Sequence, residues 1–340
     1  MLLIDALFIN NGGGKSLLDV LVNEVNKRGL KVMYLIDERI ARDYRPLNLD
    51  NVTFLEPSLI RRHLYYLKNK NYITSVLAFG NVPPSVKLKC KVFTYFHNVM
   101  YLESWQSLQM INVLPNRLKS IFIRQIKGNT TNWIVQSKFI KDKMVAKWGI
   151  SKNDILIYPI YDNRFVTRSC RKELNEAQGI KFIYISNGHF YKNHILLIEA
   201  FSVYNKLYPG SSLTLTIGEE FPKLKQIIKK AVHRGVNVID KGIISFKELK
   251  IEYENADICV YPTLFESFGL GLIEAALLKM PILASDLPFV YEVVKPNSVF
   301  NPNSKESIID SLLFAHSFKN ARAELICKNK VEELIDVISV

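Results

Sequence analysis

The sequence feature that most restricts the fold of this chain is the alternation of short apolar segments with segments of helical spacing. The alternation is clearest in residues 181–285, where the strand-like segments are KFIYIS, SLTLTIG, VNVID, DICVYP and PILAS. Strands that alternate with helices of this length form a parallel sheet covered by helices on both faces. The same alternation occupies residues 2–160, and 340 residues exceed what one core usually organises. We therefore predict an α/β protein with two Rossmann-like parallel-sheet domains.

The domain boundary is expected where this alternation stops. Residues 161–179 lose apolar periodicity and gain charge, so we place the linker there and predict an N-terminal domain 1–168 and a C-terminal domain 169–340. The last helix is expected in the second domain or packed back on the first.

The charge of the chain is concentrated in its first half. Residues 1–170 contain 25 Lys and Arg against 12 Asp and Glu, whereas residues 171–340 contain 20 of each, so the net charge of +13 belongs to the first half. Such a surface attracts polyanions, either nucleic acid or the anionic face of a membrane. The basic segments 61–70 and 103–127 are either a membrane-facing or acceptor-facing surface, or ordinary helices with a solvated face.

The cysteines and the N-terminus favour a cytosolic protein. The four cysteines are widely spaced and form no CxxC pair, which argues against a zinc site or a disulfide framework. The start MLLIDALFIN has no basic region and carries Asp5, as expected of a first core strand and not of a signal peptide. No apolar run approaches the roughly 20 residues of a membrane helix.

A glycine turn, Gly12, Gly13 and Gly14, follows the first strand and opens a helix. It is not a Walker phosphate loop, because Ile9 stands where that motif needs glycine, and Leu17 breaks the dinucleotide pattern. Consecutive glycines at a helix N-terminus still allow a phosphate to approach backbone N–H groups. The turn is therefore either a ligand contact or plain turn chemistry.

The strand at residues 91–96 ends at His97. Ligands of open α/β sheets bind at the carboxyl ends of the strands, so His97 is a candidate hydrogen-bond donor or phosphate ligand. The alternative is an ordinary polar loop residue.

The stretch 256–286 carries two carboxylates, Glu266 before a turn and Glu274 within the following helix. A glycosidase would hold two carboxyl groups roughly 5 to 9.5 Å apart across one bond. Their placement in a turn and in a helix fits different parts of one extended ligand better. Carboxylates facing hydroxyl groups, with the helix N-terminus facing phosphate, describe a site for a sugar nucleotide.

The segment ESFGLGLIEA in this stretch resembles the E-x7-E motif of retaining glycosyltransferases of family four. These enzymes have the GT-B fold, in which two Rossmann-like domains face each other across a cleft. The resemblance covers most of the chain, through NGGGKSLLDVLVNEVNKRGLKV, WIVQSKFIKDKM, YISNGHFYKNHILLIEAF and PILASDLPFVYEVV. Within this family, the chain resembles the glycosyltransferases that build bacterial surface polysaccharides.

The resemblance implies roles for individual residues. Glu274 would bind the ribose hydroxyls of the donor, Glu266 the transferred sugar, and Lys192 the diphosphate. His97 would contact the donor sugar near its anomeric carbon, so the expected catalytic residues are His97, Glu266 and Lys192. The remaining expected donor-binding residues are Gly12, Gly13, Gly14, Asn187, His189, Phe268, Gly269, Leu270 and Glu274. The family commonly has an arginine about five residues before the lysine; Asn187 stands there, with His189 nearby.

The reaction implied is sugar transfer with retention of configuration, without a metal or another cofactor. The donor is a nucleotide sugar, with UDP expected because it prevails in the family, and the acceptor is a hydroxyl of a glycan or a lipid-diphosphate-linked glycan. The basic first domain would present the acceptor at the anionic inner face of the plasma membrane, which makes the protein cytoplasmic and peripheral.

Two enzyme classes and one binding protein remain as alternatives. A sugar nucleotide epimerase would need no acceptor, and a phosphorylase would need inorganic phosphate or pyridoxal phosphate. A nucleic-acid-binding protein would interleave aromatic and basic side chains on one face. Only HLYYLKNKNY supports that reading, so we expect no nucleic-acid partner.

Overall fold

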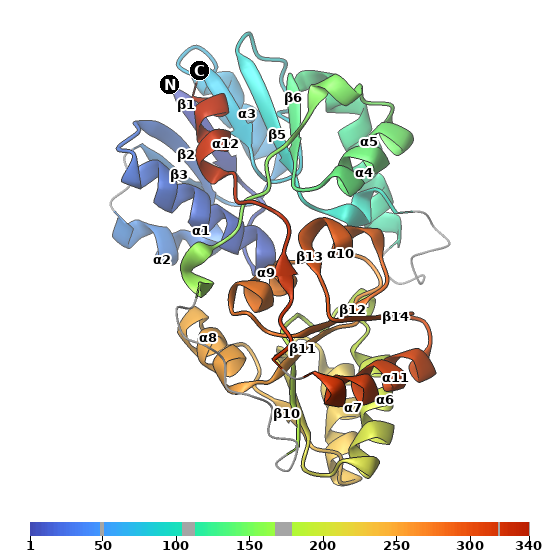
Figure 1. Cartoon of the computed structure of the whole chain (residues 1–340). Coiled ribbons are helices and arrows are strands. Elements are labelled where there is room, and N and C mark those ends of the chain that lie inside the picture. Colours follow the sequence, from blue (N-terminus) through green and yellow to red (C-terminus); the bar gives the residue numbers. More distant parts are fainter. Residues whose placement is uncertain (48–50, 104–112, 167–178, 319, 340) are drawn as a thin grey trace. The chain divides into compact units, whose positions relative to one another are not determined.

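The chain folds into two compact units, each built on a parallel sheet (Figure 1). A computed structural model describes residues 1–47, 51–103, 113–166, 179–318 and 320–339. Unit 1 consists of Met1–Asp162 and Lys328–Val340, and unit 2 of Asn163–Cys327. The boundary predicted between residues 168 and 169 lies outside the described residues.

The sheet of unit 1 has seven strands in the order β3-β2-β1-β4-β5-β6-β7, all parallel. The strands are β1 Leu2–Ala6, β2 Val32–Asp37, β3 Val52–Leu55, β4 Ser75–Ala78, β5 Lys91–Phe96, β6 Asn132–Val135 and β7 Ile155–Ile157. Every residue of β1 and β4 is buried, which explains their continuous apolar runs in the sequence.

Helices flank this sheet along the chain: α1 Gly12–Lys27, α2 Ala41–Tyr44, α3 Leu59–Asn69, α4 Val113–Ile126 and α5 Lys138–Trp148. The glycine turn forms the first turn of α1. Pro115 lies in the first turn of α4, where its missing N–H leaves no hydrogen bond unmade. Of the helical pattern predicted over 103–127, residues 104–112 lie outside the described part of the chain.

The main sheet of unit 2 has six parallel strands in the order β10-β9-β8-β11-β12-β14. They are β8 Lys181–Tyr184, β9 Ser212–Leu215, β10 Val238–Asp240, β11 Ile258–Tyr261, β12 Ile282–Ser285 and β14 Ser298–Phe300. A two-stranded antiparallel sheet pairs β13 Val294–Lys295 with β15 Glu324–Leu325. The helices are α6 His194–Leu207, α7 Pro222–His233, α8 Phe246–Asn255, α9 Leu270–Leu277, α10 Pro288–Val293 and α11 Lys305–Phe314.

The strand orders confirm the predicted fold class of two parallel-sheet domains. In each sheet the order reverses direction once, between β1 and β4 in unit 1 and between β8 and β11 in unit 2. The loops that leave the carboxyl ends of two strands diverge at such a switch point, and ligands of open α/β sheets bind there.

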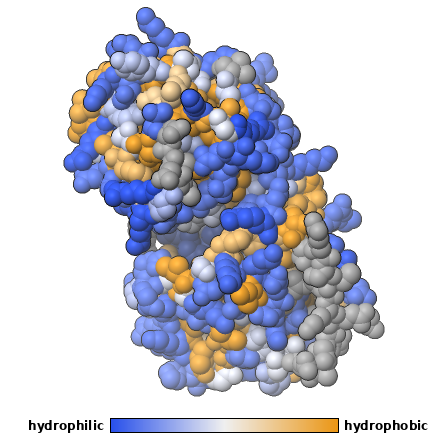
Figure 2. Space-filling view, turned by 90° about the vertical axis from the view of Figure 1, so that its left-hand side faces the viewer, coloured by the Kyte–Doolittle hydropathy of each residue, from blue (hydrophilic) through white to orange (hydrophobic). Residues whose placement is uncertain are grey.

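Hydrophilic side chains cover most of the face drawn in Figure 2, with apolar patches between them. Within the described residues, no helix combines the length and the apolar character needed to cross a bilayer.

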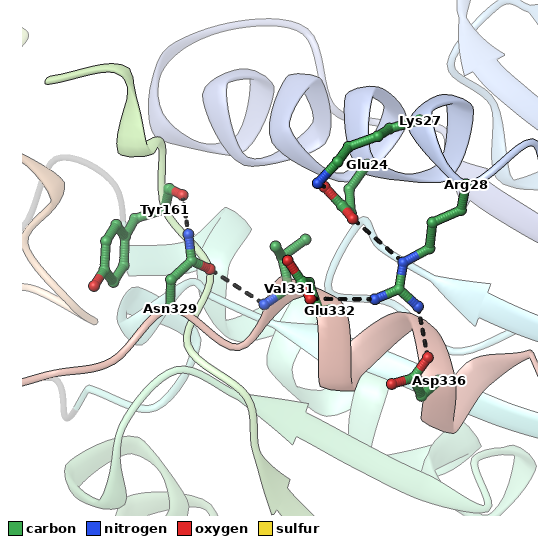
Figure 3. Close-up of polar contacts among 8 residues, drawn as sticks. All are labelled: Glu24, Lys27, Arg28, Tyr161, Asn329, Val331, Glu332 and Asp336. Atoms are coloured by element: carbon green, nitrogen blue, oxygen red, sulfur yellow. Dashed lines mark hydrogen bonds and ion pairs between the residues drawn. The ribbon is translucent and has the colours of Figure 1, made fainter. Parts of the chain in front are cut away.

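The C-terminal helix α12, Val331–Ile338, belongs to unit 1 although its sequence follows unit 2. Leu334, Ile335 and Ile338 on this helix are fully buried. Arg28 of α1 holds the exposed side of the helix, with Asp336 at 2.5 Å and Glu332 at 3.8 Å (Figure 3). The end of the chain therefore completes the core of unit 1.

Candidate functional site

The loops after β8 and β11 meet at the switch point of unit 2. The carbonyl of Tyr191 accepts hydrogen bonds from the backbone N–H of Leu264 at 2.7 Å and from the hydroxyl of Thr263 at 3.0 Å. Asn193 donates through its side chain to the carbonyl of Pro262 at 3.1 Å. These bonds fix the segment that carries Lys192 against the segment that carries Glu266.

Lys192 and Glu266 form an ion pair in which both side chains are largely buried, with exposed fractions of 11% and 17%. Glu266 Oε2 also accepts from the hydroxyl of Tyr261 at 3.2 Å, and Oε1 accepts from the backbone N–H of Ser267 at 3.2 Å. A carboxylate that accepts from three donors is held in one orientation. The ammonium of Lys192 is thereby held beside Glu266. The resemblance to the glycosyltransferases implies that the diphosphate of the donor binds at this lysine.

Glu274 lies in the second turn of α9, on the same strand–turn–helix segment as Glu266. Its Oε2 accepts a hydrogen bond of 3.1 Å from the hydroxyl of Tyr253, which comes from α8. Burial, and then the negative charge of Glu274, raise the pKa of Tyr253 well above its ordinary value. Tyr253 therefore remains a hydroxyl donor to Glu274.

Gly269 makes the turn between the two carboxylates. Its φ of +90° is left-handed, and an added Cβ would lie 3.1 Å from Leu272 Cδ1 and 3.2 Å from Phe289 Cε2. Glycine is the one residue that can adopt the left-handed backbone conformation here and also leave room for Leu272 and Phe289 without strain. The turn places the N-terminus of α9, with Leu270 at its first position, between Glu266 and Glu274 in the chain, where the helix dipole favours an anion.

The loop after β8 carries the two residues that stand near the family's missing arginine. Asn187 accepts through its side chain from the backbone N–H of His189 at 3.4 Å. The ring of His189 stacks on Tyr191, with centroids 5.5 Å apart, and meets Phe221 edge-on at 5.1 Å. Burial, and next the positive charge of Lys192, lower the pKa of His189 below its ordinary value. The lowered pKa favours the neutral form of His189, which adds no second positive charge beside Lys192.

Two polar residues beside this loop, Ser186 and His194, were not predicted as site residues from the sequence. His194 begins α6 and is buried, and its Nε2 lies 3.1 Å from Ser186 Oγ. Burial lowers the pKa of His194 to about 3, with a contribution from the charge of Lys192. The sequence pattern KNHILLIEAF gives His194 the appearance of a helix-cap residue, so nothing in it signals a buried neutral imidazole.

The switch point of unit 1 brings the glycine turn and His97 together. An added Cβ at Gly14 would lie 3.2 Å from Cε1 of His97, so the missing side chain makes room for the imidazole. The ring is half-buried and lies beside Phe79 and Tyr95, with centroids 5.8 and 6.1 Å away. Burial lowers the pKa of His97 to about 4. His97 is thus a neutral imidazole at pH 7.

Asn81, which the sequence did not single out, contacts His97 at two points. Its Oδ1 accepts from the backbone N–H of His97 at 2.7 Å, and its Nδ2 lies 3.1 Å from Nε2 of the ring. The candidate residues thus form one group in unit 1, around His97 and Gly14, and one in unit 2, around Lys192, Glu266 and Glu274.

In the basic segment 61–70, one residue, Arg62, does not lie on the predicted basic surface. Arg62 is 2% exposed and forms an ion pair with buried Asp5, Nε to Oδ2 at 2.7 Å. It therefore stabilises the interior of unit 1 and does not belong to a basic surface. Lys68 and Lys70 are exposed, as expected, and Arg61 is exposed but ion-paired with Glu56.

Comparison with known proteins finds a family model that matches the second part of the chain. The model of the family described as "Glycosyl transferases group 1" matches residues 167–331. One relative is the O-antigen chain mannosyltransferase RfbU of Salmonella typhimurium, which is 40% identical to this chain over 65 residues. The aligned segment is 19% of this chain and 18% of that protein. The O-antigen biosynthesis glycosyltransferase WclY of Escherichia coli is 22% identical over 88% of this chain and 84% of its own length.

Solved structures share the fold. The structure of HepE from Anabaena, in complex with UDP and glucose, superposes with a TM-score of 0.71 at 12% identity, over 98% of this chain and 94% of that one. At this identity the likeness establishes the GT-B fold alone. The match of the family model makes residues 167–331, just under half of the chain, similar to the group 1 glycosyl transferases.

Proposed function

We propose that this protein is a retaining glycosyltransferase that moves a sugar from a nucleotide-sugar donor to a hydroxyl of a glycan or lipid-linked glycan. The observation that carries the proposal is the arrangement at the switch point of unit 2. There, the Lys192–Glu266 pair joins two hydrogen-bonded loops, and the Gly269 turn leads from the second loop into α9, which carries Glu274. All of these residues lie within the family match.

The donor would occupy these loops from end to end. Glu274 accepts from the ribose hydroxyls, the N-terminus of α9 faces the diphosphate, and Lys192 turns from Glu266 to the phosphate charge. Glu266, released from Lys192, then accepts from the hydroxyls of the transferred sugar. A bound donor thus gives Lys192 a phosphate and Glu266 a sugar hydroxyl in place of each other, so neither charge is left buried and unpaired.

The chemistry we propose follows from the charge that develops on the leaving group. As the sugar–phosphate bond breaks, negative charge grows on the diphosphate, and the helix N-terminus and Lys192 are already placed to stabilise it. The departing diphosphate takes the proton of the acceptor hydroxyl on the same face of the sugar, which retains the configuration. We propose no metal or other cofactor in this step. UDP is the proposed nucleotide, in line with the ligand of the HepE structure.

Donor identity and the role of Lys192 can be tested in one experiment. The melting temperature is measured with UDP-, GDP- and ADP-sugars, because a ligand that binds only the native state raises it. We expect one UDP-sugar to stabilise the protein and Lys192→Ala to abolish both this shift and sugar transfer. Lys225→Ala is the matched control, since Lys225 pairs with Glu219 and Asp240 on another part of unit 2.

The outcomes separate the proposal from its alternatives. Near-normal transfer by Lys192→Ala at saturating donor would refute the diphosphate assignment. Interconversion of the donor without an acceptor would identify an epimerase, and dependence on inorganic phosphate a phosphorylase. Loss of transfer on treatment with a chelator would overturn the metal-independent mechanism, and an inverted anomeric signal in the product would overturn retention.

We also propose that unit 1 rests on the anionic inner face of the plasma membrane, which places the protein in the cytoplasm. Helix α3 supports this proposal with three exposed apolar side chains at i, i+4 and i+7, Ile60, Leu64 and Leu67. Exposed Lys68 and Lys70 follow on the same helix and at its C-terminal end. An apolar stripe flanked by basic side chains is typical of a helix that lies in a membrane interface.

A further inference from the structure

The hydrogen bonds of Asn81 determine the protonation of His97. The backbone N–H of His97 can only donate, so the 2.7 Å contact requires the carbonyl oxygen of the Asn81 side chain at that point. The amide nitrogen of Asn81 then faces Nε2 of the ring at 3.1 Å, and this nitrogen can only donate as well. Nε2 must therefore carry a lone pair, and the ring proton of neutral His97 must be on Nδ1.

Asn81 is held in place independently of any ligand. It is 6% exposed, and its φ of +68° is a left-handed conformation that asparagine tolerates better than most residues. The preceding Gly80 lies against the backbone, since an added Cβ there would be 2.4 Å from the carbonyl oxygen of Leu7. The conformation of this loop thus depends on two positions that few other residues could occupy.

The buried Arg62 fixes the other side of the same loop. Its guanidinium donates to the carbonyls of Val82 at 2.8 Å and Pro83 at 2.9 Å, and its Nε donates to Asp5 at 2.7 Å. Tyr66 also donates to Asp5, at 2.6 Å. Buried ionic groups that are fully hydrogen-bonded hold one geometry, because any other leaves a charge unpaired. Arg62 therefore fixes the loop that presents Asn81 to His97.

We propose that Asn81 is a positioning residue that keeps His97 neutral, with its proton on Nδ1, so that His97 serves sugar transfer as a hydrogen-bonding side chain and not as an acid or a base. The part that concerns sugar transfer rests on the proposed function. The surroundings of the ring favour the neutral form as well. Phe79, Tyr95 and Gly14 lie beside it; of these only Tyr95 titrates, and burial raises its pKa well above the ordinary value.

The protonation of His97 can be measured without substrates by ¹⁵N NMR of the histidine-labelled full-length protein. The two ring nitrogens give distinct shifts with and without a proton, and a His97→Gln spectrum assigns the signals. In the wild-type protein we expect a proton on Nδ1 and none on Nε2 from pH 8 down to about pH 5, since burial lowers the pKa to about 4.

Two substitutions at position 81 keep the left-handed backbone and change only the side chain. Asn81→Asp presents a carboxylate that can only accept, so we expect the proton to move to Nε2 and the pKa of His97 to rise by roughly one unit or more. Asn81→Gly removes the side chain and should give a mixture of the two neutral forms. Asn98→Asp is the matched control, because it adds the same charge next to His97 while its side chain caps the following turn at Met100.

A proton on Nε2 in the wild-type protein, or the same ring form in all three proteins, would overturn the proposal. Where transfer is measurable, Asn81→Asp should lower kcat and move the acid limb of its pH profile upward, toward the raised pKa. An unchanged profile beside the switched ring form would also contradict the proposed role in transfer. A wild-type protein that shows the expected ring form but neither binds nor transfers any sugar would refute the proposed function and leave the hydrogen-bond inference standing.

Discussion

At the scale of single residues, the two carboxylates of unit 2 are each held by a buried tyrosine. Tyr253 donates to Glu274 and Tyr261 donates to Glu266. A hydrogen bond to a charged group contributes about 1.5–3 kcal/mol, which is enough to decide where a carboxylate points. The tyrosines thus control the orientation of the groups that we propose to bind the two ends of the donor.

We expect substitution of these tyrosines to separate donor binding from catalysis. Tyr253→Phe should weaken donor affinity by roughly tenfold with little change in kcat, because ribose contacts are the same before and during reaction. Tyr261→Phe should lower kcat, because we propose that Glu266 contacts the transferred sugar. Calorimetric donor binding and initial rates give the two quantities. Tyr34→Phe is the control, since the buried Tyr34 hydroxyl has no hydrogen-bond partner among the described residues. Equal effects of both site substitutions on Kd and kcat would refute this division.

The residues that the sequence revealed and those that it hid differ in how their partners are placed. Glu266, Gly269 and Glu274 belong to one short segment, so spacing along the chain was enough to find them. Asn81 and Tyr253 contact residues 16 and 21 positions away, and their partners are set by the order of strands in the sheets. A buried tyrosine or a loop asparagine has no spacing that distinguishes it from ordinary core or turn residues.

At the scale of elements, the strands and most helices followed from local patterns, whereas helix α3 shows where such patterns stop. Its basic and aromatic sequence predicted one solvated surface, but Arg62 turns inward because Asp5, 57 residues earlier, needs a cation in the core. No local signal distinguishes Arg62 from its neighbour Arg61. The remaining exposed side chains of α3 still form an apolar stripe next to basic residues.

We expect this stripe and its lysines to bind anionic vesicles. Lys68→Ser with Lys70→Ser should weaken partitioning about 10- to 30-fold, since each basic residue near a charged bilayer contributes about 1 kcal/mol. Ile60→Ser with Leu64→Ser should weaken it through lost apolar burial, and only the lysine variant should lose its salt dependence. Co-sedimentation with phosphatidylserine vesicles measures both. Lys229→Ser with Lys230→Ser, exposed on α7, is the charge-matched control. If the α3 variants and the α7 control all partitioned to the vesicles to the same extent, the membrane proposal would be wrong.

At the scale of the whole molecule, the chain separates into two units, and unit 1 is built from two separate segments of the sequence. The two sheets followed from the strand–helix alternation, whereas the sequence left open whether the last helix, α12, packs on the first domain or the second. Its buried face resembles that of any amphipathic helix, and its partners α1 and β4 lie near the other end of the chain. One specific contact is the hydroxyl of Ser75 on β4, which donates to the carbonyl of Ile338 at 3.0 Å.

Unit 1 should therefore depend on the last helix for its stability. Ile335→Ala removes a fully buried side chain and should lower the free energy of unfolding by about 2–5 kcal/mol, whereas Arg28→Ala should have a much smaller effect because its ion pairs are exposed to solvent. Hydrogen exchange locates the effect: faster exchange is expected in β1, β4 and α1, with β8 and β11 of unit 2 unchanged. Equal acceleration in both units would show that the helix stabilises the chain by some route other than the core of unit 1.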